Sequence, residues 1–411
     1  MNMRKGYLSE YFEGVAVKRI SAVEASPERS NQHEFNGISE LRKLLGLNRR
    51  IFPARFLYLM EDEGGFESAE GSLTWYDARE NHPSRSEYRL YFPTTSVSLR
   101  LRERDLLVIG KMNDGGLTVI AVEQGSTLER QILWLFGLPD GITQRFTVRE
   151  LEQDHDVRIG FAARFILEEL GIRIKETDGN YLDLLVRKFN GQFPGTAALS
   201  EMARETCRDA DPGDDPDGTI ISWMEQELLL FTTLERHLVS LELRKGFEEN
   251  VEGFLKFSLS VHNRRKARAG MALENHLEAI FRTHGIRYGR GKITENRTRP
   301  DFVFPGIEQY HDPSFNSGLL TMLGSKSSCK DRWRQVLDEA QRIKQKHLFT
   351  LEPAISTNQT TQMQAGNLQL VIPQQLHPTF TVDQQNWLMS LRDFIVMVSE
   401  RQKLADIINL P

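Results

Sequence analysis

The N-terminal part of the chain alternates short apolar runs with turn signals over roughly the first 140 residues, which predicts a β-barrel or sandwich. Its clearest feature is a pair of apolar runs between 106 and 122 that flank the turn sequence Asn-Asp-Gly-Gly at 113–116, so we expect a hairpin there. Just before it, Arg100, Arg102 and Arg104 alternate with apolar residues, which predicts a strand with three arginines on one face. On that strand alone we favour a solvated edge over a binding surface.

From residue 159 onward the spacing of apolar residues becomes helical. The acidic stretch 209–218, rich in Pro and Gly, predicts an exposed loop or linker. Beyond it helices alternate with short strands, which indicates a sheet covered by helices. The polar stretch 359–366 predicts another loop. The predicted helices are 159–172, 220–263, 271–284, 329–346 and 384–403, and the predicted strands are 300–304, 319–326, 347–351 and 368–373.

This change of pattern predicts two domains and a connector. We expect a β-rich barrel at 1–145, a helical connector at 146–190 and an α/β domain at 191–411. A chain of 411 residues is long enough for each domain to bury its own core.

Composition excludes several classes of protein. Hydrophobic residues at 39% and charged residues at 27% are ordinary for a soluble globular chain. The net charge of −5 means that any contact with DNA must come from local patches. The two cysteines, Cys207 and Cys329, exclude a disulfide framework and fit a reducing compartment. No segment has the pattern of a signal peptide or a membrane span, so we expect a cytoplasmic protein with no membrane partner.

Two carboxylates and a lysine follow one another in an order that suggests chemistry. Asp301 stands at the start of one predicted strand and Lys326 ends the next, so pairing of the strands would bring them to one sheet edge. Gly324, in phase with Lys326, would leave room for a phosphate or a metal. The helix after the lysine would carry Glu339 at the border of its apolar stripe, and the earlier helix carries Glu274 in a similar place.

These residue types suit Mg²⁺-dependent hydrolysis of a phosphodiester, because hard oxygen ligands hold the ion and a cation stabilises the developing charge. Asp301 and Glu339 would be the metal ligands. Lys326 would orient the attacking water, and Glu274 would complete a second metal site or orient the lysine. The bland interpretation is a capping aspartate, a snorkelling lysine and two surface glutamates. Each residue alone favours this structural interpretation, and their joint order weakens it without eliminating it.

Several segments resemble the catalytic domain of the EcoRII-type (type IIE) restriction endonucleases, and the resemblance runs from Phe193 to the C-terminus. It implies a PD-(D/E)XK nuclease fold in the variant whose last acid lies on the following helix, here 339 − 326 = 13 positions after the lysine. It also implies that Asp301, Lys326 and Glu339 form the catalytic set, with Glu274 as the helix acid. The matching segments are 244–247, 263–270, 273–278, 299–305, 329–335 and 347–351.

In this family the residues four and five after the lysine read C·G pairs, which implies this role for Lys330 and Asp331. A cation suits guanine O6 and N7, and an acid suits the cytosine amino group. Without the resemblance, a polar first helical turn would be the preferred interpretation. The basic, aromatic run after the lysine indicates a recognition helix, and the resemblance adds phosphate or base contacts. The arginines concerned are Arg332 and Arg334 in the run, and Arg264, Arg265 and Arg268 from the resemblance.

Segments 75–79 and 84–89, with the 106–122 hairpin, are similar to the effector domain of the same enzymes. That domain is a DNA-binding pseudobarrel that binds an extra copy of the target and controls the nuclease. Arg85, Glu87 and Arg89 would share one face of a strand and read G and C edges. As surface charge alone they mean little.

We therefore expect a homodimeric, Mg²⁺-dependent type II restriction endonuclease that cuts double-stranded DNA at a C·G-flanked site such as CCWGG or CCNGG. Effector DNA would regulate it through the N-terminal domain, and a separately encoded DNA methyltransferase would accompany it. Two other classes stay open: a DNA-binding regulatory or defence protein with a silenced or degenerate nuclease site, and a nonspecific or RNA-directed nuclease. Ser325 follows Gly324 where an apolar strand end is expected, so we also expect local distortion of that strand.

Overall fold

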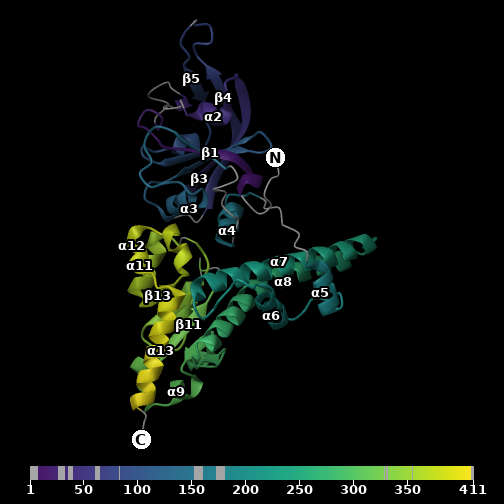
Figure 1. The fold of residues 1–411 in the computed structure, drawn as a ribbon, viewed down its shortest axis with the longest axis vertical. Coiled ribbons are helices and arrows are strands. Elements are labelled where there is room, and N and C mark those ends of the chain that lie inside the picture. The colour runs from purple at the N-terminus through teal and green to yellow at the C-terminus, as the bar shows by residue number, and fades with distance from the viewer. Residues whose placement is uncertain are drawn as a thin grey trace. The chain divides into compact units, whose positions relative to one another are not determined.

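The computed structural model divides the chain into two compact units (Figure 1). Unit 1 comprises Met1–Lys175 with Ser356–Asn358 and Pro378–Thr381, and unit 2 comprises the remainder. The division falls inside the stretch 146–190 for which a connector is predicted; the boundaries of that connector stay a prediction. The structure describes residues 8–25, 33–35, 40–60, 65–82, 84–151, 161–172, 181–327, 329, 332–353 and 355–408.

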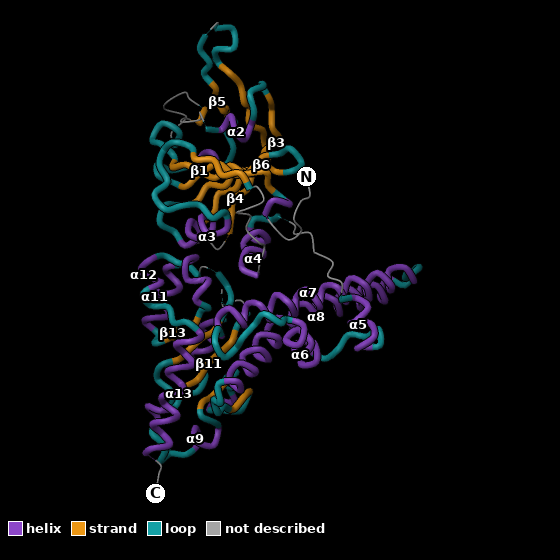
Figure 2. Tube along the Cα trace, viewed as in Figure 1, coloured by secondary structure: helices purple, strands orange, loops and turns teal. Residues whose placement is uncertain are grey.

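The described part of unit 1 is built on one eight-stranded sheet with the order β2-β5-β4-β3-β7-β6-β1-β8 (Figure 2). Neighbouring strands are antiparallel except β3 and β7, which run parallel. The strands are β1 Phe12–Arg19, β2 Glu34–Phe35, β3 Arg50–Met60, β4 Gly65–Asp77, β5 Tyr88–Tyr91, β6 Leu106–Met112, β7 Leu117–Val122 and β8 Thr147–Glu150. The helices are α2 Leu41–Leu45, α3 Thr127–Leu135 and α4 Phe161–Glu169, with 3-10 turns at Leu8–Glu10 and Ser98–Arg100.

The central strands of this sheet are buried on both faces. Val15 and Val17 of β1 join one apolar cluster with α3 and α4, whereas Ala16 joins a second cluster on the opposite face. This explains why β6 and β7 read as nearly continuous apolar runs. The hairpin predicted between 106 and 122 is confirmed, because β6 pairs antiparallel with β7.

The strand predicted just before that hairpin is wrong. Ser98–Arg100 forms a 3-10 turn, because Thr95 and Ser98 exchange side-chain hydrogen bonds with each other's backbone N–H at 2.7 and 3.0 Å. The arginines do not share one face. Arg100 pairs with Glu67, and Arg102 pairs with Glu123.

Unit 2 combines a five-stranded sheet, order β13-β12-β11-β10-β9 among the described residues, with two long helices (Figure 1). Strands β9 to β11 are antiparallel, and β11 to β13 are parallel. The strands are β9 Gly289–Arg290, β10 Phe302–Phe304, β11 Thr321–Ser325, β12 Lys346–Phe349 and β13 Leu368–Val371. The helices are α5 Leu182–Phe189, α6 Thr196–Thr206, α7 Pro216–Lys245, α8 Val251–Thr283, α9 Ile307–His311, α10 Trp333–Leu337, α11 Thr357–Ala365, α12 Val382–Gln385 and α13 Leu391–Ile408.

Three of the predicted elements of unit 2 are misplaced. The break between the long helices lies at Gly246, where φ is 77°, and not at 264–270, so α8 runs on through that basic stretch. The helix predicted at 329–346 shrinks to α10, after which Ala340 takes a φ of 46°. The stretch 359–366 lies largely in α11 and is not a loop.

Aromatic side chains join α8 to the sheet. The Phe281 ring meets the rings of Phe302 and Phe304 edge to face, with centroids 5.2 and 5.3 Å apart. Phe394 of α13 packs on Phe304 as well, at 5.7 Å. All four side chains are buried, so they fix the C-terminal half of α8 against the strand that follows Asp301.

No helix in the described ranges is long and apolar enough to cross a membrane.

We expect Phe281→Ala to destabilise unit 2 by about 3–5 kcal/mol, because it opens a cavity against two strand residues. Leu259→Ala, on the same helix but 60% exposed, should change stability by less than about 0.5 kcal/mol. Chemical unfolding followed by near-ultraviolet circular dichroism checks both. Equal midpoints for the two variants would contradict the packing.

Candidate active site

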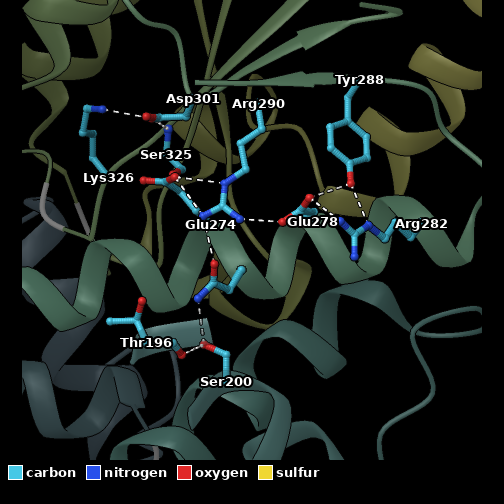
Figure 3. A network of polar contacts seen from close by, with 11 residues as sticks. Thr196, Ser200, Glu274, Glu278, Arg282, Tyr288, Arg290, Asp301, Ser325 and Lys326 are labelled. Carbon is cyan, nitrogen blue, oxygen red and sulfur yellow. Dashed lines mark hydrogen bonds and ion pairs between the residues drawn. The ribbon is translucent and has the colours of Figure 1, made fainter. Parts of the chain in front are cut away.

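Asp301 and Lys326 meet at one edge of the unit 2 sheet. Phe302 is the antiparallel partner of Leu323, so the residue before β10 and the residues at the end of β11 lie side by side. Asp301 Oδ2 accepts hydrogen bonds from the backbone N–H of Ser325 at 2.6 Å and from Lys326 Nζ at 3.0 Å (Figure 3). The ammonium and the carboxylate are both mostly buried, with 16% of each side chain exposed. The structure therefore brings together the two residues that strand pairing predicted.

The strand that leads to the lysine is regular and not distorted. Gly324 and Ser325 pair in parallel register with Leu348 and Phe349 of β12. The expected space beside Gly324 is also absent, because a Cβ there would lie 3.0 Å from a Val336 methyl carbon. Gly324 thus allows α10 to pack closely on the sheet, and a phosphate or metal at that position is not supported.

Glu339 lies in a bend after α10. The prediction that it lies on a helix is therefore wrong. Lys346 of β12 shapes the bend, since its buried ammonium donates to the backbone carbonyls of Glu339 and Ala340. Oε2 of Glu339 is buried and has no hydrogen-bond partner among the described residues. Burial raises the pKa of Glu339 to about 7; Lys326 opposes this rise, whereas Asp301 adds to it. Glu339 is therefore close enough to Asp301 and Lys326 to share their field.

Glu274 approaches the same residues from α8. Its Oε2 accepts hydrogen bonds from Arg290 Nε at 3.3 Å and Nη2 at 3.1 Å. Burial and the charge of Asp301 raise the pKa of Glu274, while Arg290 and Lys326 act in the opposite direction. Asp301, Lys326, Glu339 and Glu274 are called the acid–lysine cluster below.

Sequence reasoning missed Arg290. It lies on the short strand β9, beside the strand that follows Asp301, and binds Glu278 and Asn275 as well as Glu274 (Figure 3). The sequence gives only a weak signal for Arg290. Strand β9 is two residues long and so shows no alternation of apolar and polar residues. Arg290 also lies in a basic run with Arg287 and Lys292, which resembles a surface loop.

The cluster offers a divalent cation suitable ligands. Mg²⁺ is commonly held by one or two carboxylates and completes its octahedron with water. Asp301 would supply one carboxylate, and the buried oxygen of Glu339, unpartnered among the described residues, would supply another. No group of three or more His, Cys, Asp or Glu side chains with metal-binding geometry occurs in the described part of the chain, so the ion would rely on these two acids and on water.

Of the residues predicted to contact DNA after the lysine, Lys330 and Asp331 lie outside the described residues. Arg332 is exposed, just before α10. Arg334 is exposed too; its guanidinium stacks 4.7 Å from the Trp333 ring centroid and donates to Gln362.

The three arginines of α8 differ from one another. Arg264 stacks on Phe193, 4.0 Å from the ring centroid, and the exposed Arg265 pairs with Glu235 at 2.6 Å. Arg268 is only 7% exposed and its guanidinium packs over Phe231, so in this structure it is not presented to DNA as predicted. Its position on the face of α8 that meets α7 explains this burial, which also lowers its pKa.

In unit 1, Arg85, Glu87 and Arg89 do not lie together on one strand. β5 begins at Tyr88, so Arg85 and Glu87 precede it, and Arg85 is exposed. Glu87 binds Arg79 and Arg89, and Arg89 also binds Glu34 at 3.0 Å. In place of the predicted alternating face, Glu87 and Arg89 belong to an ion-pair network, and Arg85 is an exposed residue of the segment before β5.

Two sequence comparisons point to one family. The sequence model of the family described as "EcoRII C terminal" matches residues 231–395. The chain is 31% identical over 390 residues to the "Type II restriction enzyme EcoRII" of Escherichia coli, covering 93% of each protein. Among solved structures, metal-depleted Ecl18kI with uncleaved DNA has 19% identity and a TM-score of 0.46, over 57% of this chain and 87% of that one. The PspGI–substrate DNA complex has 15% identity and a TM-score of 0.39, over 54% and 90%.

Glu339→Gln should stabilise the metal-free protein more at pH 8 than at pH 5. Because the pKa of Glu339 is raised from 4.5 to about 7 in the folded protein, its burial adds no ionisation cost below pH 4.5. The cost grows as pH rises from 4.5 to about 7 and is complete above that. The difference amounts to about 2–3 kcal/mol, or several degrees in thermal midpoint. Thermal unfolding in EDTA across this range measures it, with the exposed Glu308→Gln as control. Parallel curves for wild type and Glu339→Gln would refute the raised pKa.

Proposed function

The chain belongs to the EcoRII family of type II restriction endonucleases, and on this premise we propose which of its residues cut DNA and what they require. The enzyme hydrolyses both strands of DNA at a short C·G-flanked site such as CCWGG or CCNGG. Its catalytic centre is the acid–lysine cluster on a PD-(D/E)XK nuclease fold. Two observations support this most. The Lys326 ammonium lies 3.0 Å from Asp301, and the charges of both residues act on Glu339, whose buried Oε2 has no partner in the described ranges.

Asp301 and Glu339 would hold Mg²⁺, which when bound supplies a Lewis acid for the phosphoryl oxygens and lowers the pKa of a bound water. Asp301 is fixed for this by the Ser325 N–H, so its second oxygen, Oδ1, keeps a set direction. Lys326 orients the attacking water and offers its positive charge to the negative charge that develops on the phosphate. Because both partners of the ion pair are mostly buried, that charge is weakly screened by solvent.

Glu274 is the fourth member of the proposed centre. It acts from α8, a different element from the other three residues, and its negative charge is felt by Asp301 and Lys326. In this place it orients the lysine or serves a second cation. The buried aromatic contacts of Phe281, seven residues further along α8, hold Glu274 at this edge of the sheet.

We assign recognition of the DNA target to the segment 330–334, which follows Lys326. Lys330 would donate to guanine O6 and N7, and Asp331 would accept from the cytosine amino group, with Arg332 and Arg334 nearby for the backbone. A site that reads nearly the same on both strands calls for two copies of the chain, so the active form is a homodimer. Host DNA would be protected by a separate methyltransferase.

Unit 1 would bind a further copy of the target and thereby regulate cleavage. The support is the ordered Arg79–Glu87–Arg89–Glu34 network and the exposed Arg85, two residues before Glu87 in the sequence, which offers a cation to a phosphate or a base.

Lys326→Ala should reduce the cleavage rate at least about 100-fold, because it removes the charge that faces the phosphate. The assay uses plasmids with CCWGG or CCNGG sites, Mg²⁺ or EDTA, and sequencing of the ends. Lys344→Ala, an exposed lysine of the same unit, should cut like wild type. DNA binding by Lys326→Ala should stay within about threefold of wild type. Lack of cutting by the wild type despite specific binding would favour a regulatory protein with a silenced site.

Addition of a short duplex that carries the target should stimulate cleavage of a single-site plasmid, and Arg85→Ala should lose this stimulation about tenfold, equivalent to one charge-assisted contact. Arg145→Ala, another exposed arginine of unit 1, is the matched control. Stimulation that is unchanged in Arg85→Ala would exclude Arg85 from the effector site.

A further inference from the structure

Arg290 is the centre of a polar network that reaches well beyond the acid–lysine cluster (Figure 3). Its register partner is Phe302, the residue next to Asp301. The guanidinium uses three nitrogens: Nε and Nη2 donate to Glu274, Nη1 donates to Glu278 at 2.5 Å, and Nη2 also donates to Asn275 at 2.9 Å. One planar fork thus donates to three side chains of α8, those of Glu274, Asn275 and Glu278, a geometry that lysine could not reproduce.

The network is anchored on both sides. Glu278 also accepts from Arg282 at 2.6 Å and from the Tyr288 hydroxyl at 2.8 Å. Asn275 donates to Ser200 Oγ of α6 at 3.1 Å. The guanidinium therefore has little freedom to move, because its acceptors are themselves held by separate elements.

Glu274 is held less securely than Glu278. Among the described residues, the hydrogen bonds to the Glu274 carboxylate come from Arg290, and both are accepted by Oε2. The side chains of Arg290 and Glu274 are each 21% exposed, so the pair is partly screened but mostly out of water. Without Arg290 the carboxylate would lie beside the negative Asp301 with no donor of its own in the described ranges, and it would turn away or take up a proton.

We propose that Arg290 is a positioning residue, which holds the Glu274 carboxylate against the Asp301–Lys326 pair in one orientation and leaves Oε1 for the reaction. Glu278, which the Tyr288 hydroxyl holds even without Arg282, and Asn275 keep Arg290 in place. This rests on the proposed function, because the orientation matters for cleavage only if Glu274 is part of the active site. A structural ion pair would stabilise the fold equally well but would have no specific effect on the rate.

The test compares Arg290→Met with Arg282→Met, which removes another arginine from the same carboxylate of Glu278 but does not touch Glu274. Single-turnover cleavage in Mg²⁺ should fall about 10- to 100-fold in Arg290→Met, because small misplacement of an oriented group has effects of this size. It should stay within about twofold of wild type in Arg282→Met. DNA affinity measured in Ca²⁺ should be unchanged in both, which separates positioning from binding.

A double-mutant cycle with Glu274→Gln supplies the decisive comparison. Arg290→Met should cause no further loss of rate when Glu274 is already Gln. Thermal midpoints give a readout independent of activity, since the midpoint lost in Arg290→Met should be largely regained in the double variant. Arg290→Lys, which keeps the charge but not the fork, should show an intermediate rate.

Losses of rate that multiply in the double variant would overturn the proposal, as would equal losses in Arg290→Met and Arg282→Met. If Arg290→Met did not fold, a wild-type rate in Arg290→Lys would overturn it. Failure of the wild type to cut, with the midpoints still coupled, would instead reject the proposed active site and leave the Arg290–Glu274 contact standing.

Discussion

The candidate site depends on the burial of three carboxyl groups near a single lysine, Lys326. Asp301 is compensated directly by Lys326 and a backbone N–H, and Glu274 by Arg290. Glu339 has no such partner in the described residues, so its carboxyl stays partly neutral near pH 7. Because the charge of Asp301 raises the cost of ionising both Glu274 and Glu339, the group as a whole favours a bound cation. Functional sites commonly contain ionisable groups with unfavourable electrostatic energies, and the stability of the surrounding fold must offset them.

That support comes mainly from apolar packing. The rings of Phe281, Phe302, Phe304 and Phe394 hold α8 and α13 against β10, and Val336 fills the space above Gly324. These contacts position backbone segments from α8, β10 and β11, on which three of the four candidate residues sit. The polar network of Arg290 then sets the direction of one of these side chains within a frame that is already rigid.

Much of this arrangement was predictable from the sequence, for identifiable reasons. The pairing of Asp301 with Lys326 follows from strand alternation and short connections, and the 106–122 hairpin follows from its turn residues. Predictions failed where tertiary contacts decide local structure. Ala340 takes a positive φ because Lys346 binds the adjacent carbonyls, a contact that no local pattern reveals. Arg268 resembles a surface cation, yet α7 covers it. Arg290 lies on a strand too short to show a period.

The bend that carries Glu339 has a consequence for how this architecture tolerates change. The acid is not aligned by the helix before it; it is tied through its own carbonyl to Lys346, on the strand that pairs with the end of β11. Its distance from Lys326 is therefore set by the spacing of neighbouring strands, not by the number of helical turns between them. Insertions or deletions within α10 would then leave the acid in register with the lysine, so the proposed recognition segment could diversify in length without displacing the proposed catalytic acid.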